Sequence, residues 1–256
     1  MSKNTAVATK NDDTALALAG AFDDIDLGFG QVDSSDYAIP RLAILGDLSP
    51  QVKKQNARYI EGAEPGMIAD VGMGELVPDS VLHFLPVQRV KEWIEWFPRK
   101  SNKGIANRFT HDRIKELDLV RNDRNEFLTR EGNEIIEHHT YFGLNLGQDN
   151  RWSFISMKKS NFKAERPFFT KATAIKLPSG KQAPLFFKSY LFKTFLDGTD
   201  PQYWNWKIED GPMTLDLPNA DEVIRSALKL KTSIETGQAK ADMRDDVVDA
   251  DSDIPF

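Results

Sequence analysis

Short runs of aromatic and β-branched residues, separated by glycine, proline and Asn-Asp turns, fill the chain from residue 37 to about residue 218. Such runs between turn residues are typical of strands. We expect strands at 67–70, 81–97, 127–130, 134–146, 152–157 and 184–195. Pro86 predicts a bend or an edge in the second of these strands, because proline cannot donate to a ladder. In the fourth strand apolar and polar residues alternate, which predicts burial of one face only.

Two segments carry helix signals. Residues 110–118 predict a short helix with Thr110 as N-cap and with Ile114 and Leu117 facing inward. Residues 221–235 predict a longer helix that begins near Asn219 or Asp221 and ends before Gly237. Its apolar side consists of Val223, Ile224, Ala227, Leu228, Leu230 and Ile234. We expect this helix to cover a β-barrel or one of its edges.

The net charge of −6 hides an uneven distribution. Residues 1–36 and residues 241–256 each sum to −5, whereas residues 37–240 sum to +4. The acidic ends hold few apolar residues and are expected to be disordered, leaving one folded domain at 37–240. Between Arg151 and Lys193 there are ten basic residues and a single acid, Glu165. This segment is a candidate track for phosphates, because polyanions are neutralised by lysine and arginine.

Several classes of protein are disfavoured by what the sequence lacks. There is no cysteine, and therefore no disulfide framework, thiol nucleophile or cysteine-type zinc site. The four histidines show no metal-binding spacing, and no glycine-rich segment has the form of a phosphate-binding loop. We therefore expect no enzyme activity and no cofactor. The absence of a long apolar stretch and of a secretory signal predicts a soluble, cytoplasmic protein.

A protein that binds single-stranded nucleic acid without sequence preference combines a basic groove with aromatic rings on which bases stack. The basic segment carries both kinds of side chain. Strand alternation places Trp152 and Phe154 on one face and Ile155 and Met157 on the other, so that one pair packs in the core while the other meets solvent or ligand. Aromatic residues in strands are more often core than ligand platforms, and this alternative stays open for each ring. The candidate residues of the segment are Arg151, Trp152, Phe154, Lys158, Lys159, Phe162, Lys163, Arg166, Phe168, Phe169, Lys171, Lys188 and Tyr190.

A second cluster lies at residues 91–108. It places tryptophans on a strand that runs into a polar, basic loop, as expected of a β-loop that clamps a nucleic-acid strand. A hairpin with its tryptophans in the core is an equally good interpretation. The candidate residues here are Trp93, Trp96, Phe97, Arg99, Lys100, Lys103 and Arg108.

The last residues form an unusual end, in which an acidic run too charged to fold closes on three residues of apolar character. Proline stiffens the approach, and phenylalanine can fill a pocket on a partner. The partner-binding candidates are Asp249, Asp251, Asp253, Ile254, Pro255 and Phe256. This end resembles the C-terminal tip of bacterial and bacteriophage single-stranded DNA-binding proteins (SSBs), although Ser252 interrupts the aspartates that usually precede it. The resemblance covers about the last ten residues.

The resemblance implies a mainly β, OB-fold-like barrel that binds single-stranded DNA in replication, recombination and repair. It also implies a tail that recruits polymerase, helicase or nuclease partners and competes with DNA for the basic groove. A bacteriophage protein acting in the bacterial cytoplasm is expected, with homo-oligomers possible. Three alternatives stay open: a strand-annealing or RNA-binding protein, an adaptor that binds no nucleic acid, and, third, a nuclease.

Overall fold

The computed structural model describes residues 39–98, 101, 103–123, 125–199, 201–239 and 241. The strands are β1 (Leu42–Ile44), β2 (Ile68–Asp70), β3 (Glu75–Leu76), β4 (Leu82–Trp96), β5 (Ile105–Phe109), β6 (Val120–Arg121), β7 (Phe127–Leu128), β8 (Glu134–Asn145), β9 (Arg151–Lys158), β10 (Lys188–Asp197) and β11 (Tyr203–Met213). The α-helices are α2 (His111–Ile114), α3 (Phe162–Ala174) and α4 (Ala220–Glu235). Short 3-10 turns are η2 (Pro50–Val52), η3 (Pro78–Ser80), η5 (Lys159–Asn161), η6 (Leu185–Phe187) and η7 (Thr214–Asp216).

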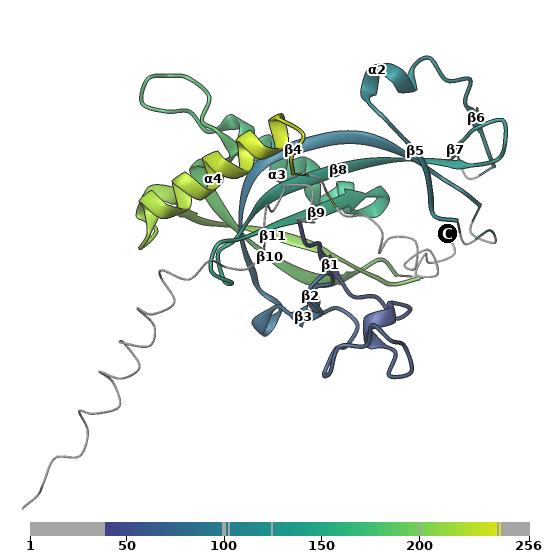
Figure 1. Ribbon diagram of the computed structural model, residues 1–256, viewed down its shortest axis with the longest axis horizontal. Helices are drawn as coiled ribbons and strands as arrows, with labels where there is room; N and C mark the ends of the chain where they lie inside the picture. Colours follow the sequence, from purple (N-terminus) through teal and green to yellow (C-terminus); the bar gives the residue numbers. More distant parts are fainter. Residues whose placement is uncertain are drawn as a thin grey trace, which may run out of the picture. The chain divides into compact units, whose positions relative to one another are not determined.

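The five longest strands form one curled sheet in the order β11-β10-β4-β8-β9 (Figure 1). β4, β8 and β9 are antiparallel neighbours, and the chain then returns through α3 to place β10 on the other side of β4. A fourth strand that returns beside the first defines a Greek key, and a partly open five-stranded Greek-key barrel is the OB-fold arrangement. The predicted mainly β, OB-fold-like architecture with a C-terminal helix is confirmed as a curled half-barrel.

The bend in this sheet lies in β4, which pairs with both β8 and β10. The register between β4 and β8 shifts between Pro86 and Gln88, as expected where proline interrupts a ladder. Gly143 lies opposite this bulge, and a Cβ atom there would be 2.3 Å from the carbonyl oxygen of Leu85. The close approach of the two backbones therefore requires glycine at position 143.

A small sheet of β1, β2 and β3 lies against the open side of the half-barrel. The Phe154 amide of β9 donates to the Pro40 carbonyl oxygen at 3.0 Å. Near the other edge, the Thr194 hydroxyl of β10 donates to the Gly66 carbonyl oxygen at 2.6 Å. β1 contacts both β9 and β11, so the segment that contains it spans the gap between the two edge strands.

Both faces of the curled sheet are covered by helices. On the inner face, Phe168 and Ala172 of α3 join a core that includes Tyr141 of β8. On the outer face, α4 packs Val223, Ala227 and Leu230 in a core with Phe142 and Leu144 of β8. The expectation that 134–146 is buried on one face only is therefore wrong, because β8 is a central strand with a helix on each side.

The helix predicted at 221–235 is confirmed as Ala220–Glu235, although Leu228 of its predicted apolar side is about half exposed. The helix predicted at 110–118 shortens to the single turn His111–Ile114, with Ile114 buried. The strand expected at 184–195 begins later, at Lys188, after the turn η6. Strand β11 and helix α3 lie in segments where no element was predicted.

Candidate nucleic-acid interface

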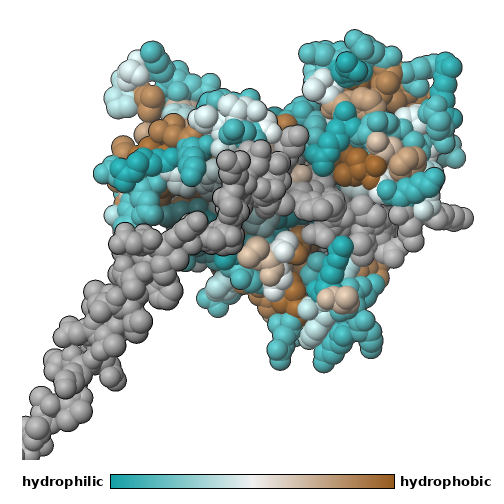
Figure 2. All heavy atoms as spheres, in the orientation of Figure 1, coloured by the Kyte–Doolittle hydropathy of each residue, from teal (hydrophilic) through white to brown (hydrophobic). Residues whose placement is uncertain are grey.

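Half of β4 and half of β8 extend into an arm that also contains β5, β6, β7 and α2 (Figure 1). Within the arm the rings of Trp93 and Phe127 meet edge to face, with centroids 5.9 Å apart. Val120 on β6 is half exposed, and Figure 2 shows hydrophobic patches among the hydrophilic residues of the arm. At the turn from β4 to β5, the Lys103 ammonium lies 5.5 Å from the centre of the Phe97 ring. Of the candidates expected at 91–108, the arm therefore carries Trp93, Phe97 and Lys103.

One face of the sheet gathers a tryptophan, a buried histidine and two cations. Strand pairing places His138 opposite Lys158, and Arg108 opposite Ile94, so these side chains project from the same face as Trp96. The Lys158 ammonium lies 5.5 Å from the Trp96 ring centre, and the Trp96 and His138 ring centres are 6.1 Å apart. A guanidinium nitrogen of Arg108 lies 3.3 Å from a carboxylate oxygen of Glu92.

Both cations and acids surround His138 on this face. Burial lowers the pKa of His138 well below its usual value, and the charges of Lys158, Arg41 and Arg108 lower it further, so the imidazole is neutral at physiological pH. Glu92 and Glu134 project from the same face, where Glu92 pairs with Arg108 and Glu134 with Lys159.

Four buried polar atoms on this same face have no hydrogen-bond partner within the described residues. They are Gln88 Oε1, Trp96 Nε1, His138 Nε2 and Thr140 Oγ1. Alternation along β4 and β8 puts all four side chains on the outer face, although His138 Nδ1 contacts Ser156 Oγ at 2.9 Å. Because buried polar groups in native proteins are nearly always paired, these atoms require water or another polar group that the described residues do not supply. We call Gln88, Trp96, Arg108, His138, Thr140 and Lys158 the Trp96 face.

Helix α4 covers the neighbouring part of the outer face. The Trp152 indole N–H donates to Ser226 Oγ of α4 at 3.1 Å, and the Lys229 ammonium lies 5.8 Å from the Trp152 ring centre. Phe154 is fully buried in the core under α4. The expectation that one pair of β9 side chains meets solvent or ligand is corrected here, because α4 packs over the Trp152 pair while α3 and β1 enclose Ile155 and Met157.

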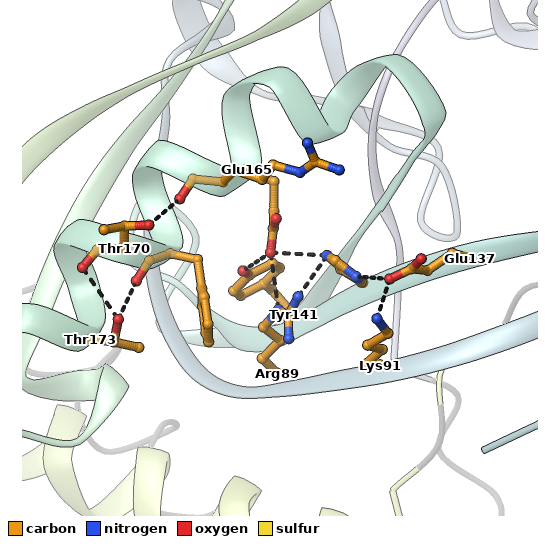
Figure 3. Close-up of polar contacts among 10 residues, drawn as sticks. Arg89, Lys91, Glu137, Tyr141, Glu165, Thr170 and Thr173 are labelled. Carbon is orange, nitrogen blue, oxygen red and sulfur yellow. Dashed lines mark hydrogen bonds and ion pairs between the residues drawn. The ribbon is translucent and has the colours of Figure 1, made fainter. Parts of the chain in front are cut away.

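The inner face holds a buried charge network that ties α3 to the sheet (Figure 3). Glu165 of α3 accepts from Arg89 Nε at 3.0 Å and from the Tyr141 hydroxyl at 2.5 Å. Arg89 also places a guanidinium nitrogen 2.7 Å from His139 Nδ1, and His139 Nε2 lies 2.8 Å from a carboxylate oxygen of Glu137. Burial alone would raise the pKa of Glu165, but contacts with His139 and Tyr141 and the charge of Arg89 lower it to about 2.

Two aromatic residues of α3 complete this attachment. Phe162 packs against the His139 ring with centroids 4.5 Å apart, and Phe169 lies 4.3 Å from the Arg89 guanidinium carbon. Phe162 and Phe169, both candidates for base stacking, therefore contribute to the contact between helix and sheet.

The basic track expected between residues 151 and 193 is partly neutralised in the fold. Among the described residues, acids from other segments pair with several of its cations, in the pairs Arg151–Glu75, Lys159–Glu134, Lys163–Asp197, Lys188–Asp210 and Lys193–Glu209. Arg166 and Lys171 on α3 are exposed and have no acidic partner within the described residues. Sequence reasoning missed this pairing because the acids are remote along the chain.

The remaining predicted binding residues either lie in the hydrophobic core or fall outside the residues that the structure describes. Phe154, Phe168 and Tyr190 are almost completely buried, so their rings offer no face to a base. Trp96 is 8% exposed, with the Lys158 ammonium over its ring, and its indole N–H is buried without a partner in the described residues. The following candidates lie outside the described residues: Arg99, Lys100, Asp249, Asp251, Asp253, Ile254, Pro255 and Phe256. Gln88, His138 and Thr140 were missed, because only strand register shows that they lie beside Trp96.

A family model described as Pam3 phage gp34-like protein matches residues 8–240. The chain belongs to this family. Membership agrees with the expectation of a bacteriophage protein, and the match ends before the acidic tail at 241–256 on which the SSB resemblance rests. No curated protein and no solved structure matches the chain.

Two further observations concern the described residues alone. None of their helices is long and apolar enough to cross a membrane. No group of three or more histidine, aspartate or glutamate side chains lies close enough together there to hold a metal ion.

Proposed function

We propose that this family member binds single-stranded DNA on the Trp96 face, with little sequence preference. The observation that carries the proposal is the juxtaposition of Trp96, Arg108 and Lys158 with four unpartnered buried polar atoms on one sheet face. The face takes Gln88 and Trp96 from β4, Arg108 from β5, and its remaining residues from β8 and β9. β8 and β9 are the second and third strands of the Greek-key barrel, and OB-folds bind oligonucleotides on the corresponding strands.

The chemistry of binding follows from the residues of the face. Arg108 and Lys158 attract phosphates and release their counterions, which makes binding sensitive to salt. When the Lys158 ammonium moves from the Trp96 ring to a phosphate, a base takes its place over the indole. The indole N–H, the neutral His138 imidazole and the Thr140 hydroxyl supply hydrogen bonds at the floor.

The acidic segment at 241–256 has a separate role in the proposal. Its aspartates compete with DNA for the cations of the Trp96 face, and residues 254–256 recruit replication or recombination proteins, as the SSB resemblance implies. Truncation after Ala241 is expected to leave oligo-dT binding intact or tighter while partner recruitment is lost. Weaker binding after truncation would contradict this role.

The main test is a titration with fluorescent oligo-dT at several salt concentrations. Lys158→Ala and Arg108→Ala are each expected to weaken binding and to reduce the slope of log affinity against log salt by about one. Lys231→Ala on α4 is the control, because Lys231 is a surface lysine that pairs only with Glu235 of its own helix. Absence of salt-dependent binding by the full chain would overturn the proposal in favour of an adaptor, whereas tighter binding of oligo-U would favour an RNA-binding protein.

A further inference from the structure

The outer side of helix α3 and the loop that follows it form a basic surface separate from the Trp96 face. Four of its cations are exposed and have no acidic partner in the described part of the chain. We call them the α3 ridge, and they are Arg166, Lys171, Lys176 and Lys181. Residues 162–184 contain a single acid, Glu165, which contacts the sheet and is 1% exposed. This segment therefore presents only positive charge to solvent.

The packing of α3 keeps its cations on the solvent side. Helical spacing turns Glu165, Phe168 and Ala172 toward the sheet, where all three are buried. Arg166 and Lys171 lie outside this stripe, and both are exposed. All three phenylalanines of the helix contact other rings or a guanidinium of the sheet. The α3 ridge therefore offers cations to a ligand but no aromatic ring on which a base stacks.

The loop after α3 is hydrogen-bonded as a short hairpin. The Leu177 amide donates to the Lys181 carbonyl oxygen at 2.8 Å, and Lys176 pairs with Gln182 in an antiparallel bridge. Gly180 closes the turn with φ at 81°, a conformation that glycine adopts without strain. The two lysines of the loop are therefore carried by a defined turn, close in sequence to the end of the helix.

Two acids of β10 and β11 lie close to α3, and both are paired with other cations. Asp197 accepts from Lys163 of α3 at 3.0 Å. Asp210 borders the same hollow as Lys171, and it pairs with Lys188 at 3.3 Å. Protein surfaces usually mix both signs of charge, so four exposed cations without acidic partners favour a polyanion as the ligand.

We propose that the α3 ridge holds phosphates of the same single strand that lies on the Trp96 face. The inference rests on the proposed function and extends it from one surface to two. Lys158, which supplies a cation to the Trp96 face, is the last residue of β9, and only the turn η5 separates it from the start of α3. A strand that leaves the Trp96 face past Lys158 therefore meets the α3 ridge next.

An acidic segment of a partner protein is the other polyanion that such a surface accepts. The position of the ridge directly after Lys158 favours the nucleic-acid strand. The strand also gives the ridge a measurable signature, because contacts with phosphates release counterions but bring no base onto a tryptophan. The ridge is therefore expected to add salt dependence without adding tryptophan quenching.

The first experiment compares a short and a long oligo-dT, with DNA in excess so that one chain binds each strand. About 8 nucleotides lie within the range that one OB-fold occupies, whereas about 30 exceed it. The slope of log affinity against log salt is expected to be steeper by about 3 for the long oligomer, since four more phosphates are neutralised at about 0.7 each. Tryptophan quenching at saturation is expected to be the same for both oligomers.

A variant without the ridge charges tests the assignment directly. It combines Arg166→Gln, Lys171→Gln, Lys176→Gln and Lys181→Gln. The slope for the long oligomer is expected to fall to that of the short one, while binding of the short oligomer stays unchanged. The matched control removes the same charge from α4 and from the loop after η2, with Lys53→Gln, Lys54→Gln, Arg225→Gln and Lys231→Gln. A ridge variant that keeps the steep slope, or a control that loses as much, would overturn the inference.

A second experiment asks whether the ridge contacts the backbone of the same strand. The short oligomer is extended either with abasic phosphodiester units or with uncharged methylphosphonate units. The abasic extension is expected to bind like the long oligomer, and the uncharged extension like the short one. Two short oligomers bound to each wild-type chain, and one to each ridge variant, would mean that the ridge takes a separate strand and would overturn the shared path.

Failure of this inference and failure of the proposed function give different results. If Lys158→Ala weakens binding of the short oligomer but the ridge variant leaves the long-oligomer slope unchanged, the ridge alone is excluded. If the ridge variant abolishes binding of the long oligomer while quenching is absent and Lys158→Ala has no effect, the Trp96-face proposal is excluded and the shared path with it. No binding of either oligomer would exclude both.

Discussion

The two faces of the central sheet both bury polar side chains, but they differ in how those side chains are satisfied. On the inner face, Glu165, Arg89, Tyr141 and His139 contact one another in a closed network. On the outer face, the buried atoms of the Trp96 face lack partners in the described part of the chain. A paired network stabilises the fold, whereas unpartnered atoms cost stability unless a ligand completes them. Under the proposed function, the inner network stabilises the fold and the outer cluster serves binding.

The largest expected effect is on the paired network. Glu165→Ala leaves Arg89 buried beside an empty space, and it is expected to lower the free energy of unfolding by about 3 to 5 kcal/mol. Tyr141→Phe removes a single hydrogen bond to the same carboxylate and should cost about 1 kcal/mol. Urea denaturation measures both values. A loss below about 1 kcal/mol for Glu165→Ala would mean that the network does not hold α3.

The lowered pKa of Glu165 predicts how the free energy of unfolding depends on pH. The pKa of Glu165 is lowered from 4.5 to about 2 in the folded chain, so its contribution is complete above about pH 4.5. This contribution, about 3 kcal/mol, is lost as the pH falls from 4.5 towards 2. Glu165→Gln should flatten the stability profile in this window. Denaturation at a series of pH values, with wild type and variant side by side, is the measurement, and parallel profiles would refute the assignment.

The smallest expected change concerns the unpartnered face. Thr140→Val keeps the shape of the side chain and removes a buried hydroxyl without a partner, so the free energy of unfolding should stay constant or rise by up to about 1 kcal/mol. Oligo-dT affinity should fall about threefold, because one hydrogen bond to the ligand is lost. Thr194→Val is the matched control, since the Thr194 hydroxyl donates to Gly66 and its loss should destabilise the fold. A clear loss of stability in Thr140→Val would mean that the Thr140 hydroxyl makes a hydrogen bond that stabilises the fold, and it would contradict this prediction.

Much of the fold could be predicted from local pattern, because the strand runs and the apolar face of the helix at 220–235 are local properties. Helix α3 could not be predicted in this way, because Pro167 and the phenylalanines beside it give little helical signal. The helix is held instead by the contact of its Glu165 with Arg89 of the sheet. Strand β11 contains Gly211 and Pro212, and its pairing with β10 maintains it. These elements depend on contacts that no local window contains.

The sequence predicts which kinds of residue form the candidate site, but it does not predict which of them lie together in the fold. The sequence identifies Trp96, Arg108 and Lys158 as candidates, because aromatic and basic residues cluster in their segments. For His138 the sequence shows only that metal-binding spacing is absent, and the pairing of β8 with β4 and β9 is what brings it beside Trp96. Likewise, the acids that neutralise several cations of the basic segment come from strands and loops whose proximity depends on the fold.

The segment that bridges β9 and β11 also bears on how the chain reaches its folded state. Contacts between β1 and β11 join positions near the two ends of the described domain, and such non-local contacts slow folding. Until residues 39–77 have docked, the half-barrel edges that they contact, β9 and β11, are uncovered, and uncovered strand edges can template aggregation. A shortened chain that begins after Val77 would keep this exposure permanently, so the bridging segment also protects the protein from edge-to-edge association.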